Sequence, residues 1–270
     1  MTREEAQRFV LSLVNRDRAD HDLPPVKWDD TAAKSGQRHA DDMAAHGFTA
    51  HIGSDGSVPE LRHTEAGGKG MVMENVGCFA DGQDRALDAD GKFLPEGLEK
   101  IEHAFMSEVP PMDGHKRNIL TAWHTTFGVG LALTKGLAIP CMSQEFTDDY
   151  GEYDDLPAKA SIGAKLKVKG KLRSPATIAG VGISRVDHLQ PMKPSDLNKT
   201  GGYAIPKPYA TYFPKGFQTP IPVEVDGNAF RIDLPLSDHG KPGLYEVSVW
   251  AKLPQTKDLL MVSLRTIRVE

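Results

Sequence analysis

HGFTAHIGSDGSVPELR, residues 46–62, is the stretch of this 270-residue chain that says most about its fold. It follows a helical pattern that stops at Gly47, and it places His51 in a glycine-rich loop that leads to Arg62. A single histidine beside an Asp-Gly turn is more often a structural residue than a ligand. Whether His51 is a structural residue or a ligand therefore has to be judged together with other segments of the chain.

Four further segments combine a carboxylate or an imidazole with turn residues, or show strand-like alternation. They are MENVG (73–77), FMSEVPPMDGHKRNIL (105–120), FGVGLAL (127–133) and CMSQEF (141–146). In this order and at this spacing, the segments resemble the CAP superfamily, also called the SCP domain family. Its members include cysteine-rich secretory proteins, antigen 5, plant pathogenesis-related proteins and many bacterial extracellular proteins. The resemblance covers about residues 3–150.

This resemblance implies an α-β-α sandwich whose paired histidines and glutamates line one cleft. Two positions depart from the family pattern: Met73 stands where relatives usually have glycine, and Asp113 stands where bacterial relatives more often have serine. The backbone around the first glutamate is therefore expected to differ from that of relatives. The four residues that carry over are His51, Glu74, Glu108 and His115.

The hydrophobic pattern of the first half agrees with such a fold. Apolar residues at helical spacing predict a helix near the N-terminus, a second after an N-cap at Asp29 or Asp30, and a third that carries Glu108 near its C-terminal end and is broken by Pro110 and Pro111. Alternation in 127–133 and 137–146 predicts two neighbouring strands. Helices on both faces of a small antiparallel sheet are the expected arrangement.

The pattern changes beyond an acidic, proline-ended segment at 147–159. Short alternating runs separated by turn signals predict six or seven strands in an immunoglobulin-like β-sandwich. Residues 186–220, rich in Pro, Lys and Tyr, are expected to form a long loop. The sequence thus predicts an α+β protein with a CAP-like domain over 1–156 and an all-β domain over 157–270, and we expect the two to fold separately.

The net charge of −5 is divided unevenly along the chain. Residues 1–156 hold 15 Lys and Arg against 28 Asp and Glu, whereas residues 157–270 hold 17 against 9. The acidic first half argues against nucleic acid as a partner, and the basic second half favours an anionic cell-envelope polymer. We expect no membrane span, because no apolar run approaches the length that crosses a bilayer.

Two observations bear on where the protein works. Met1 is followed directly by an amphipathic helix without a secretory signal, which is typical of a cytoplasmic protein. The resemblance implies export to the extracellular space or cell envelope instead, and a signal peptide already removed from this chain would reconcile the two. Cys78 and Cys141 are the only cysteines; we expect two buried free thiols, with a disulfide as the alternative.

Two imidazoles and two carboxylates in one cleft suit a divalent ion such as Zn²⁺. His51 and His115 are predicted as its ligands, and Glu74 and Glu108 as further ligands or as hydrogen-bonding partners of the imidazoles. A water molecule on the metal, with one of these glutamates as general base, would make the protein a hydrolase. The glutamates are catalytic only in that case.

The sequence does not support nucleotide, thiol or classical serine chemistry. The sequence has no phosphate-binding loop, no H-E-x-x-H, no C-x-x-C and no G-x-S-x-G, and Gly128-Val129-Gly130 lies inside a predicted strand. Asn75 is expected to hold loop backbone through its side chain. Glu145 is expected to point outward or to join a hydrogen-bond network, rather than to act as a fifth acid of the cleft.

Three functions are compatible with these residues. A secreted binding module that holds a divalent metal and a small ligand, such as a lipid, sterol or glycan, is preferred, because no oxyanion stabiliser or specificity pocket is recognisable. The alternatives are a metal-dependent, peptidase-like extracellular hydrolase that uses the same cleft, and a cell-envelope interaction scaffold. The sequence leaves open whether the protein is an enzyme.

Overall fold

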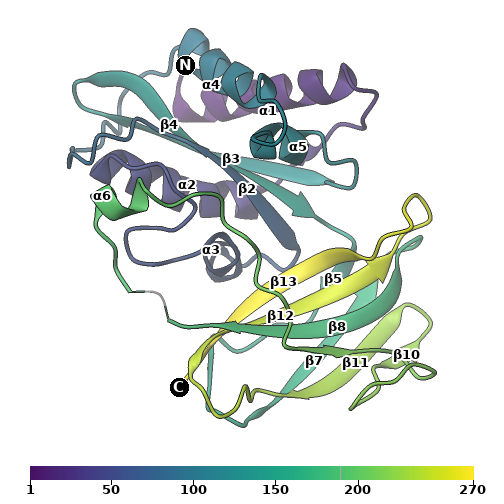
Figure 1. Ribbon diagram of the computed structural model, residues 1–270. Coiled ribbons are helices and arrows are strands. Elements are labelled where there is room, and N and C mark those ends of the chain that lie inside the picture. The colour runs from purple at the N-terminus through teal and green to yellow at the C-terminus, as the bar shows by residue number, and fades with distance from the viewer. Residues whose placement is uncertain (189) are drawn as a thin grey trace. The chain divides into compact units, whose positions relative to one another are not determined.

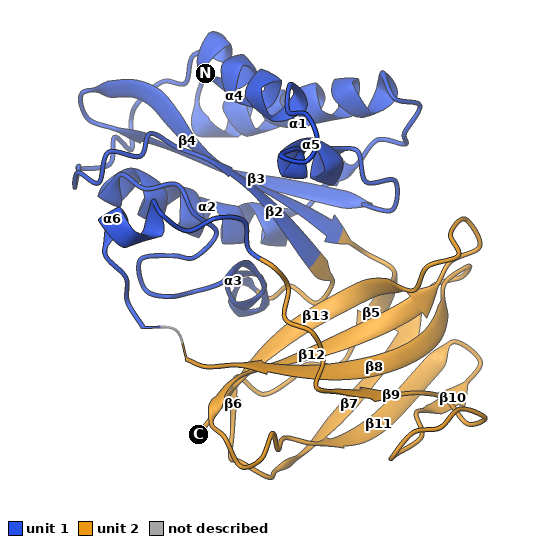
Figure 2. Ribbon diagram, in the orientation of Figure 1, with its two compact units in different colours: residues 1–66, 72–147, 190–203 blue, residues 67–71, 148–189, 204–270 orange. Residues whose placement is uncertain are grey.

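The computed structural model describes residues 1–188 and 190–270 and divides the chain into two compact units (Figures 1 and 2). Unit 1 comprises residues 1–66, 72–147 and 190–203, and unit 2 comprises residues 67–71, 148–189 and 204–270. The main difference from the predicted ranges, 1–156 and 157–270, is that a segment of the second half belongs to unit 1. Separate folding of the two predicted domains stays a prediction.

The first two helices begin and end where the sequence places their capping residues. Helix α1 (Arg3–Ala19) starts with a capping box formed by Thr2 and Glu5. Helix α2 (Asp30–His46) is capped by Asp29, whose carboxylate accepts hydrogen bonds from the backbone N–H groups of residues 31 and 32. It ends at Gly47, which has a left-handed φ of 64°.

A four-stranded sheet forms the centre of unit 1, in the order β1-β3-β4-β2. Strands β3 and β4 pair antiparallel, as their alternation predicts, and the short β1 runs parallel to β3. Strand β2, which contains Glu74, lies at one edge of the sheet and was not predicted as a strand. The bounds are β1 (Lys27–Trp28), β2 (Met71–Gly77), β3 (Thr126–Thr134) and β4 (Leu137–Asp148).

Helices cover both faces of this sheet (Figure 1). On one face α2 lies directly on β3, because Gly128 and Gly130 have no side chain: a Cβ at Gly128 would lie 2.1 Å from the backbone nitrogen of Ala33. On the other face Val129 and Leu131 pack in a core cluster with apolar residues of α1 and α4. The predicted α-β-α layering of a CAP fold is thus confirmed. The remaining helices of these layers are α3 (Pro59–Ala66), α4 (Pro95–Met106) and α5 (Gly114–Ile119).

The two cysteines form a disulfide, so the expectation of free thiols was wrong. Cys141 lies on β4 and Cys78 directly follows β2, the neighbouring strand, and their Cα atoms are 4.2 Å apart. Strand pairing creates this proximity, and the pairing of β2 was not readable from the sequence. The disulfide links residues 63 positions apart within unit 1.

Residues 190–203 contain a short helix, α6 (Pro194–Leu197), and pack on unit 1 rather than forming part of a free loop. Leu197 is fully buried in a cluster with Met43, Phe48 and Val76. We name residues 190–203 the strap. A chain ending at residue 156 would lack it.

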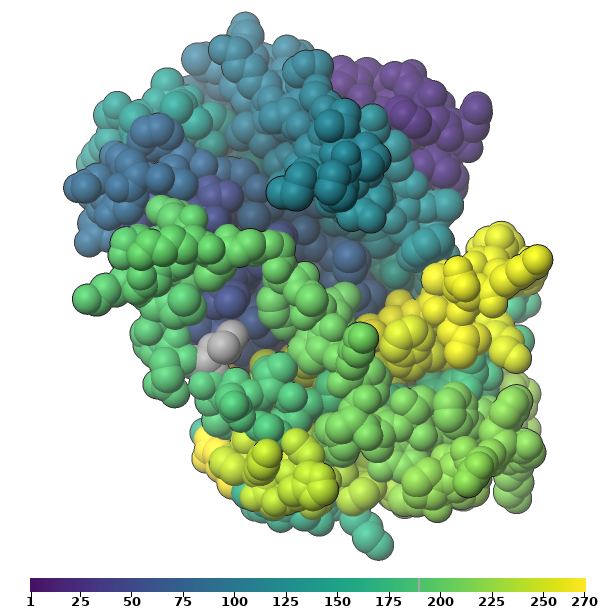
Figure 3. All heavy atoms as spheres, viewed as in Figure 1, coloured from purple at the N-terminus to yellow at the C-terminus, as the bar shows by residue number. Residues whose placement is uncertain are grey.

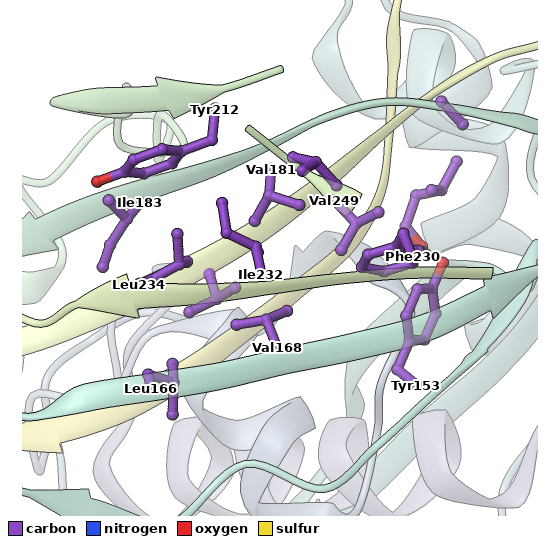
Figure 4. Packing of buried hydrophobic residues seen from close by; sticks show 14 of the residues in the cluster. Tyr153, Leu166, Val168, Val181, Ile183, Tyr212, Phe230, Ile232, Leu234 and Val249 are labelled. Atoms are coloured by element: carbon purple, nitrogen blue, oxygen red, sulfur yellow. Dashed lines mark hydrogen bonds between the residues drawn. The ribbon is translucent and has the colours of Figure 1, made fainter. Parts of the chain in front are cut away.

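Unit 2 consists of two sheets that share one hydrophobic cluster (Figure 4). Val168 and Ile232 from the first sheet meet Val181 and Val249 from the second. The first sheet has the order β10-β11-β7-β5 and the second β6-β13-β12-β8-β9. An immunoglobulin-like topology stays a prediction. The strands are β5 (Gly151–Tyr153), β6 (Lys159–Ala160), β7 (Lys165–Leu172), β8 (Thr177–Val186), β9 (Ala210–Tyr212), β10 (Glu224–Asp226), β11 (Ala229–Pro235), β12 (Gly243–Lys252) and β13 (Leu260–Val269).

The two units differ less in net charge than the two halves of the sequence do. Unit 2 holds 16 Lys and Arg against 13 Asp and Glu, because the acidic residues of 148–155 belong to it and Lys193 and Lys199 do not. Among the described residues, no helix is long and apolar enough to cross a membrane.

We expect the disulfide to contribute to the stability of unit 1. In the chain-entropy account, a cross-link that closes a loop of this length raises the free energy of unfolding by about 4 kcal/mol. The double variant Cys78→Ser/Cys141→Ser should lose about this amount in chemical denaturation, and reduced wild-type protein should behave like the variant. Titration of two free thiols in the unreduced, denatured wild type would contradict the pairing.

Candidate functional site

His51 is bound to a buried ion pair. Its Nδ1 lies 2.9 Å from Oε1 of Glu74, and the second oxygen of that carboxylate, Oε2, accepts a hydrogen bond of 2.7 Å from Nη2 of Arg62. The side chains of Arg62 and Glu74 are each only 1% exposed. Arg62 comes from α3 and Glu74 from β2, so the pair joins a helix to the edge strand beneath it.

Two effects oppose each other at the Glu74 carboxyl. Burial raises its pKa, but Arg62, His39 and His51 together outweigh burial, and the pKa lies well below its usual range. Glu74 is therefore a carboxylate that only accepts hydrogen bonds. It follows that the hydrogen between His51 and Glu74 sits on Nδ1 of the imidazole.

A second glutamate lies next to Glu74 in the opposite protonation state. Burial and the charge of Glu74 raise the pKa of Glu145 well above its usual range. The hydroxyl of Ser143 is 2.9 Å from Glu145 Oε1 and 3.1 Å from Glu74 Oε2, and it has one hydrogen to donate. As a neutral acid, Glu145 can donate its own hydrogen to Ser143, which leaves the Ser143 hydrogen for Glu74. The network role expected for Glu145 is confirmed, and an outward orientation is wrong because the residue is fully buried.

Side chains of α2 and α3 hold the backbone around His51 through hydrogen bonds. The ring of His39, on α2, lies with Nε2 2.7 Å from the carbonyl oxygen of Ala50. Because burial lowers the pKa of His39 to about 4, this ring is neutral and donates from Nε2. Arg62 Nη2 donates to the carbonyl of His51 itself at 3.0 Å. The same guanidinium thus orients both the backbone of His51 and the carboxylate that binds its ring.

His115 forms a second histidine–glutamate pair. Its Nδ1 is 2.5 Å from Oε1 of Glu108, and its backbone N–H donates to Oε2 at 2.9 Å. Glu108 lies two residues beyond the end of α4, across the Pro110-Pro111 turn, and its carboxylate caps the first turn of α5. The ring of Phe105 stacks on the imidazole with centroids 4.4 Å apart. These neighbours therefore fix both the plane of the His115 ring and its tautomer.

Consecutive residues of β2 reach toward the two pairs. Side chains alternate along a strand, so Glu74 points to the α2 face and Asn75 to the α1 face. The Asn75 amide donates from Nδ2 to the carbonyl of His115 at 3.2 Å and to Gln144 Oε1 at 3.1 Å, and its oxygen accepts from Asn118 at 2.9 Å. The expectation that Asn75 holds backbone is confirmed, although it does so from a strand.

The Asn75 network ends in a buried acid. Gln144 donates to Oε2 of Glu102 at 2.5 Å, and burial raises the pKa of Glu102 to about 8. Glu102 is therefore neutral near pH 7. Each histidine is therefore backed by a hydrogen-bond network that ends in one protonated carboxyl group: Glu145 on the His51 side of the sheet and Glu102 on the His115 side.

The two histidines share a chemical arrangement. Each donates its Nδ1 hydrogen to a carboxylate, so each neutral ring has an unprotonated Nε2, and the side chains of His51 and His115 remain 18% and 29% exposed. Carboxylates orient metal-binding histidines in the same way. Each ring thus offers one nitrogen of the kind that can bind a metal ion. No group of three or more His, Cys, Asp or Glu side chains among the described residues is placed to hold an ion, so the geometry does not assemble Glu74 and Glu108 as further ligands.

Comparison with known proteins identifies the family of the N-terminal half. Residues 11–138 match the model of the CAP family, described as the cysteine-rich secretory protein family. The N-terminal half of this chain is a CAP domain. Among solved structures, the chain is similar to an extracellular protein containing an SCP domain from Bacillus anthracis str. Ames, with 20% identity and a TM-score of 0.42. That match covers 54% of this chain and 41% of the other, so it spans less than half of that protein. No curated protein matches.

Sequence reasoning assigned the four predicted residues of the CAP domain to one cleft. The structure shows two histidine–glutamate pairs, and a cleft shared by both pairs stays a prediction. His51 contacts Glu74, and His115 contacts Glu108. Sequence reasoning assigned no role to Arg62 or Ser143. Arg62 had a signal, because it lies within the segment that suggested the family, but the burial that gives it its importance was not readable.

We expect Arg62 to be among the residues of the CAP domain most sensitive to substitution. Arg62→Met would leave the Glu74 carboxylate buried without its partner, which typically costs about 3–5 kcal/mol of unfolding free energy. Arg38→Met is the matched control: Arg38 pairs with Asp55 and Glu65 at the surface, where ion pairs contribute about 1 kcal/mol or less. Similar losses for the two variants in urea denaturation would contradict the central place of Arg62.

Proposed function

We propose that this protein is a secreted binding module whose CAP domain holds a divalent metal, best suited to Zn²⁺, through Nε2 of His51 and Nε2 of His115. The single observation that carries the proposal is the pairing of each imidazole Nδ1 with a carboxylate. Such pairing presents an unprotonated Nε2 and raises the basicity of the ring as a ligand. A small ligand, such as a lipid, sterol or glycan fragment, would bind at the same place.

Each residue of the proposed site has a distinct part. His51 and His115 would supply the ligand nitrogens, and a bound Zn²⁺ would offer a Lewis acid with positions open to water or to an oxygen of the ligand. Glu74 and Glu108 fix the tautomer and the ring direction. Asn75, which binds the backbone of His115 and follows Glu74 in β2, keeps the two pairs in register along one strand.

The solvent exposure of Glu74 and Glu108 helps to decide between a binding protein and a hydrolase. A hydrolase would need a general base beside the metal-bound water. Glu74 is too buried for this part, whereas the side chain of Glu108 is 22% exposed. Glu108 is therefore the residue on which the alternative function, a metal-dependent hydrolase, depends. Both of its oxygens are already engaged with His115, which favours the binding module.

Location outside the cell is part of the proposal. The disulfide between Cys78 and Cys141 supports it, since disulfides persist in oxidising compartments. The third candidate, a scaffold held on an anionic envelope polymer, rests on the basic second half. Unit 2 has an excess of only three basic residues, so we do not prefer it.

Calorimetric titration with Zn²⁺ tests the proposal. We expect wild-type protein to bind one ion, Glu108→Gln to bind it about 10- to 100-fold more weakly because the imidazole loses its carboxylate partner, and His115→Ala to lose still more. His103→Ala, which removes an exposed histidine of α4, is the matched control and should bind like wild type. Equal Zn²⁺ affinity of wild type and His115→Ala would refute the proposal.

A further inference from the structure

We propose that the strap, residues 190–203, positions His51, so that a segment from the second half of the sequence completes the site of the CAP domain. This role extends the proposed function, because its biological meaning depends on ligand binding by His51. Its structural part, the fixing of the His51 ring, can be tested without any ligand. Figure 3 shows the green atoms of the strap region lying over blue atoms from the early part of the chain.

Three hydrogen bonds join the strap to the loop that carries His51. The Asn198 side chain accepts from the backbone N–H of Thr49 at 3.0 Å and donates to the carbonyl of Gly47 at 3.2 Å. On the other side of His51, the backbone N–H of Met192 donates to the carbonyl of Ser54 at 3.0 Å. The strap therefore holds the loop both before and after His51.

Apolar contacts strengthen the same attachment. Leu197 is fully buried among Phe48, Ala50 and Val76, and Ile52 and Met192 pack against this cluster. Ala50 and Ile52 are the direct neighbours of His51 in the chain. At its end, the strap is fastened to α3 by the hydroxyl of Tyr203, which donates to Glu60.

The strap acts together with the two residues that hold the loop from the helices. His39 binds the carbonyl of Ala50 and Arg62 binds that of His51, whereas Asn198 supplies the partner for the N–H of Thr49. A ring can keep a 2.9 Å hydrogen bond to the buried Glu74 only while its backbone stays in place. Loss of Asn198 would remove the hydrogen-bond partner of the Thr49 N–H and one of the two donors to the Gly47 carbonyl, and the ring of His51 would then sample other orientations.

NMR of the full chain tests this role in the variant Asn198→Ala. We expect the backbone amides of residues 47–54 to exchange with solvent about tenfold faster, the factor that corresponds to loss of one ordinary hydrogen bond. The ¹⁵N signals of the His51 ring should shift away from a single Nδ1–H tautomer. His115 lies on the other face of the sheet and should keep its signals, which makes it an internal control.

Two further variants separate positioning from general destabilisation. Asp196→Ala removes an exposed pair with Lys199 on the same strap and should leave His51 unchanged. Val129→Ala weakens the core on the opposite face and should lower stability without affecting the His51 tautomer. If Asn198→Ala fails to fold, Asn198→Asp keeps the acceptor for Thr49 but sets a carboxylate against the Gly47 carbonyl, and it should shift His51 in the same direction.

Unchanged His51 signals in the folded Asn198 variants, or equal changes at His51 and His115, would overturn the strap's role. Zn²⁺ titration adds a separate readout: Asn198→Ala should bind about tenfold more weakly than wild type and Asp196→Ala equally well. Wild-type protein that binds no Zn²⁺ would refute the proposed function, while the His51 signals would still decide whether the strap positions the ring.

Discussion

The buried ion pair between Arg62 and Glu74 is the interaction on which the candidate site depends. Taking two charges out of water is costly, and such a pair is stable only when its remaining hydrogen-bonding groups are also satisfied. Glu74 meets this condition through His51 and Ser143, and Arg62 meets it in part: it donates to the carbonyls of His51 and Ser57, but its buried Nε has no hydrogen-bond partner among the described residues. Burial alone would protonate Glu74. Because Arg62, together with His39 and His51, keeps it ionised, the carboxylate can fix the tautomer of His51.

Strand β2 connects this half of the site to the other. As an edge strand with alternating side chains, it presents Glu74 to one helical layer and Asn75 to the other. The histidines therefore come from different layers of the α-β-α fold, His51 from the loop after α2 and His115 from α5. Two adjacent residues of β2 bind them: Glu74 binds the ring of His51, and Asn75 binds the backbone carbonyl of His115. Neutral acids behind them, Glu145 and Glu102, keep further negative charge out of the sheet.

Local signals predicted much of the fold, and tertiary contacts decided the rest. Asp29 and Gly47 marked the ends of α2, because capping is local chemistry. The contact of His51 with Glu74 followed only from the resemblance to the CAP superfamily. Strand β2 was missed, since MENVG mixes apolar and polar residues without clean alternation. The disulfide was missed with it, because no sequence pattern brings Cys78 to Cys141 until β2 and β4 pair. The strap lacks periodicity, so nothing in its residues says what Leu197 packs against.

Two carboxylates, one buried and one half-buried, hold the histidines as Nδ1–H tautomers with free Nε2 atoms. The most direct measurement is the two-bond ¹H–¹⁵N NMR correlation spectrum of the imidazole rings in the wild-type protein, at a pH where the rings are neutral and without added metal. We expect His51 and His115 each to show one tautomer, with the hydrogen on Nδ1. A dominant Nε2–H tautomer at either residue would contradict it.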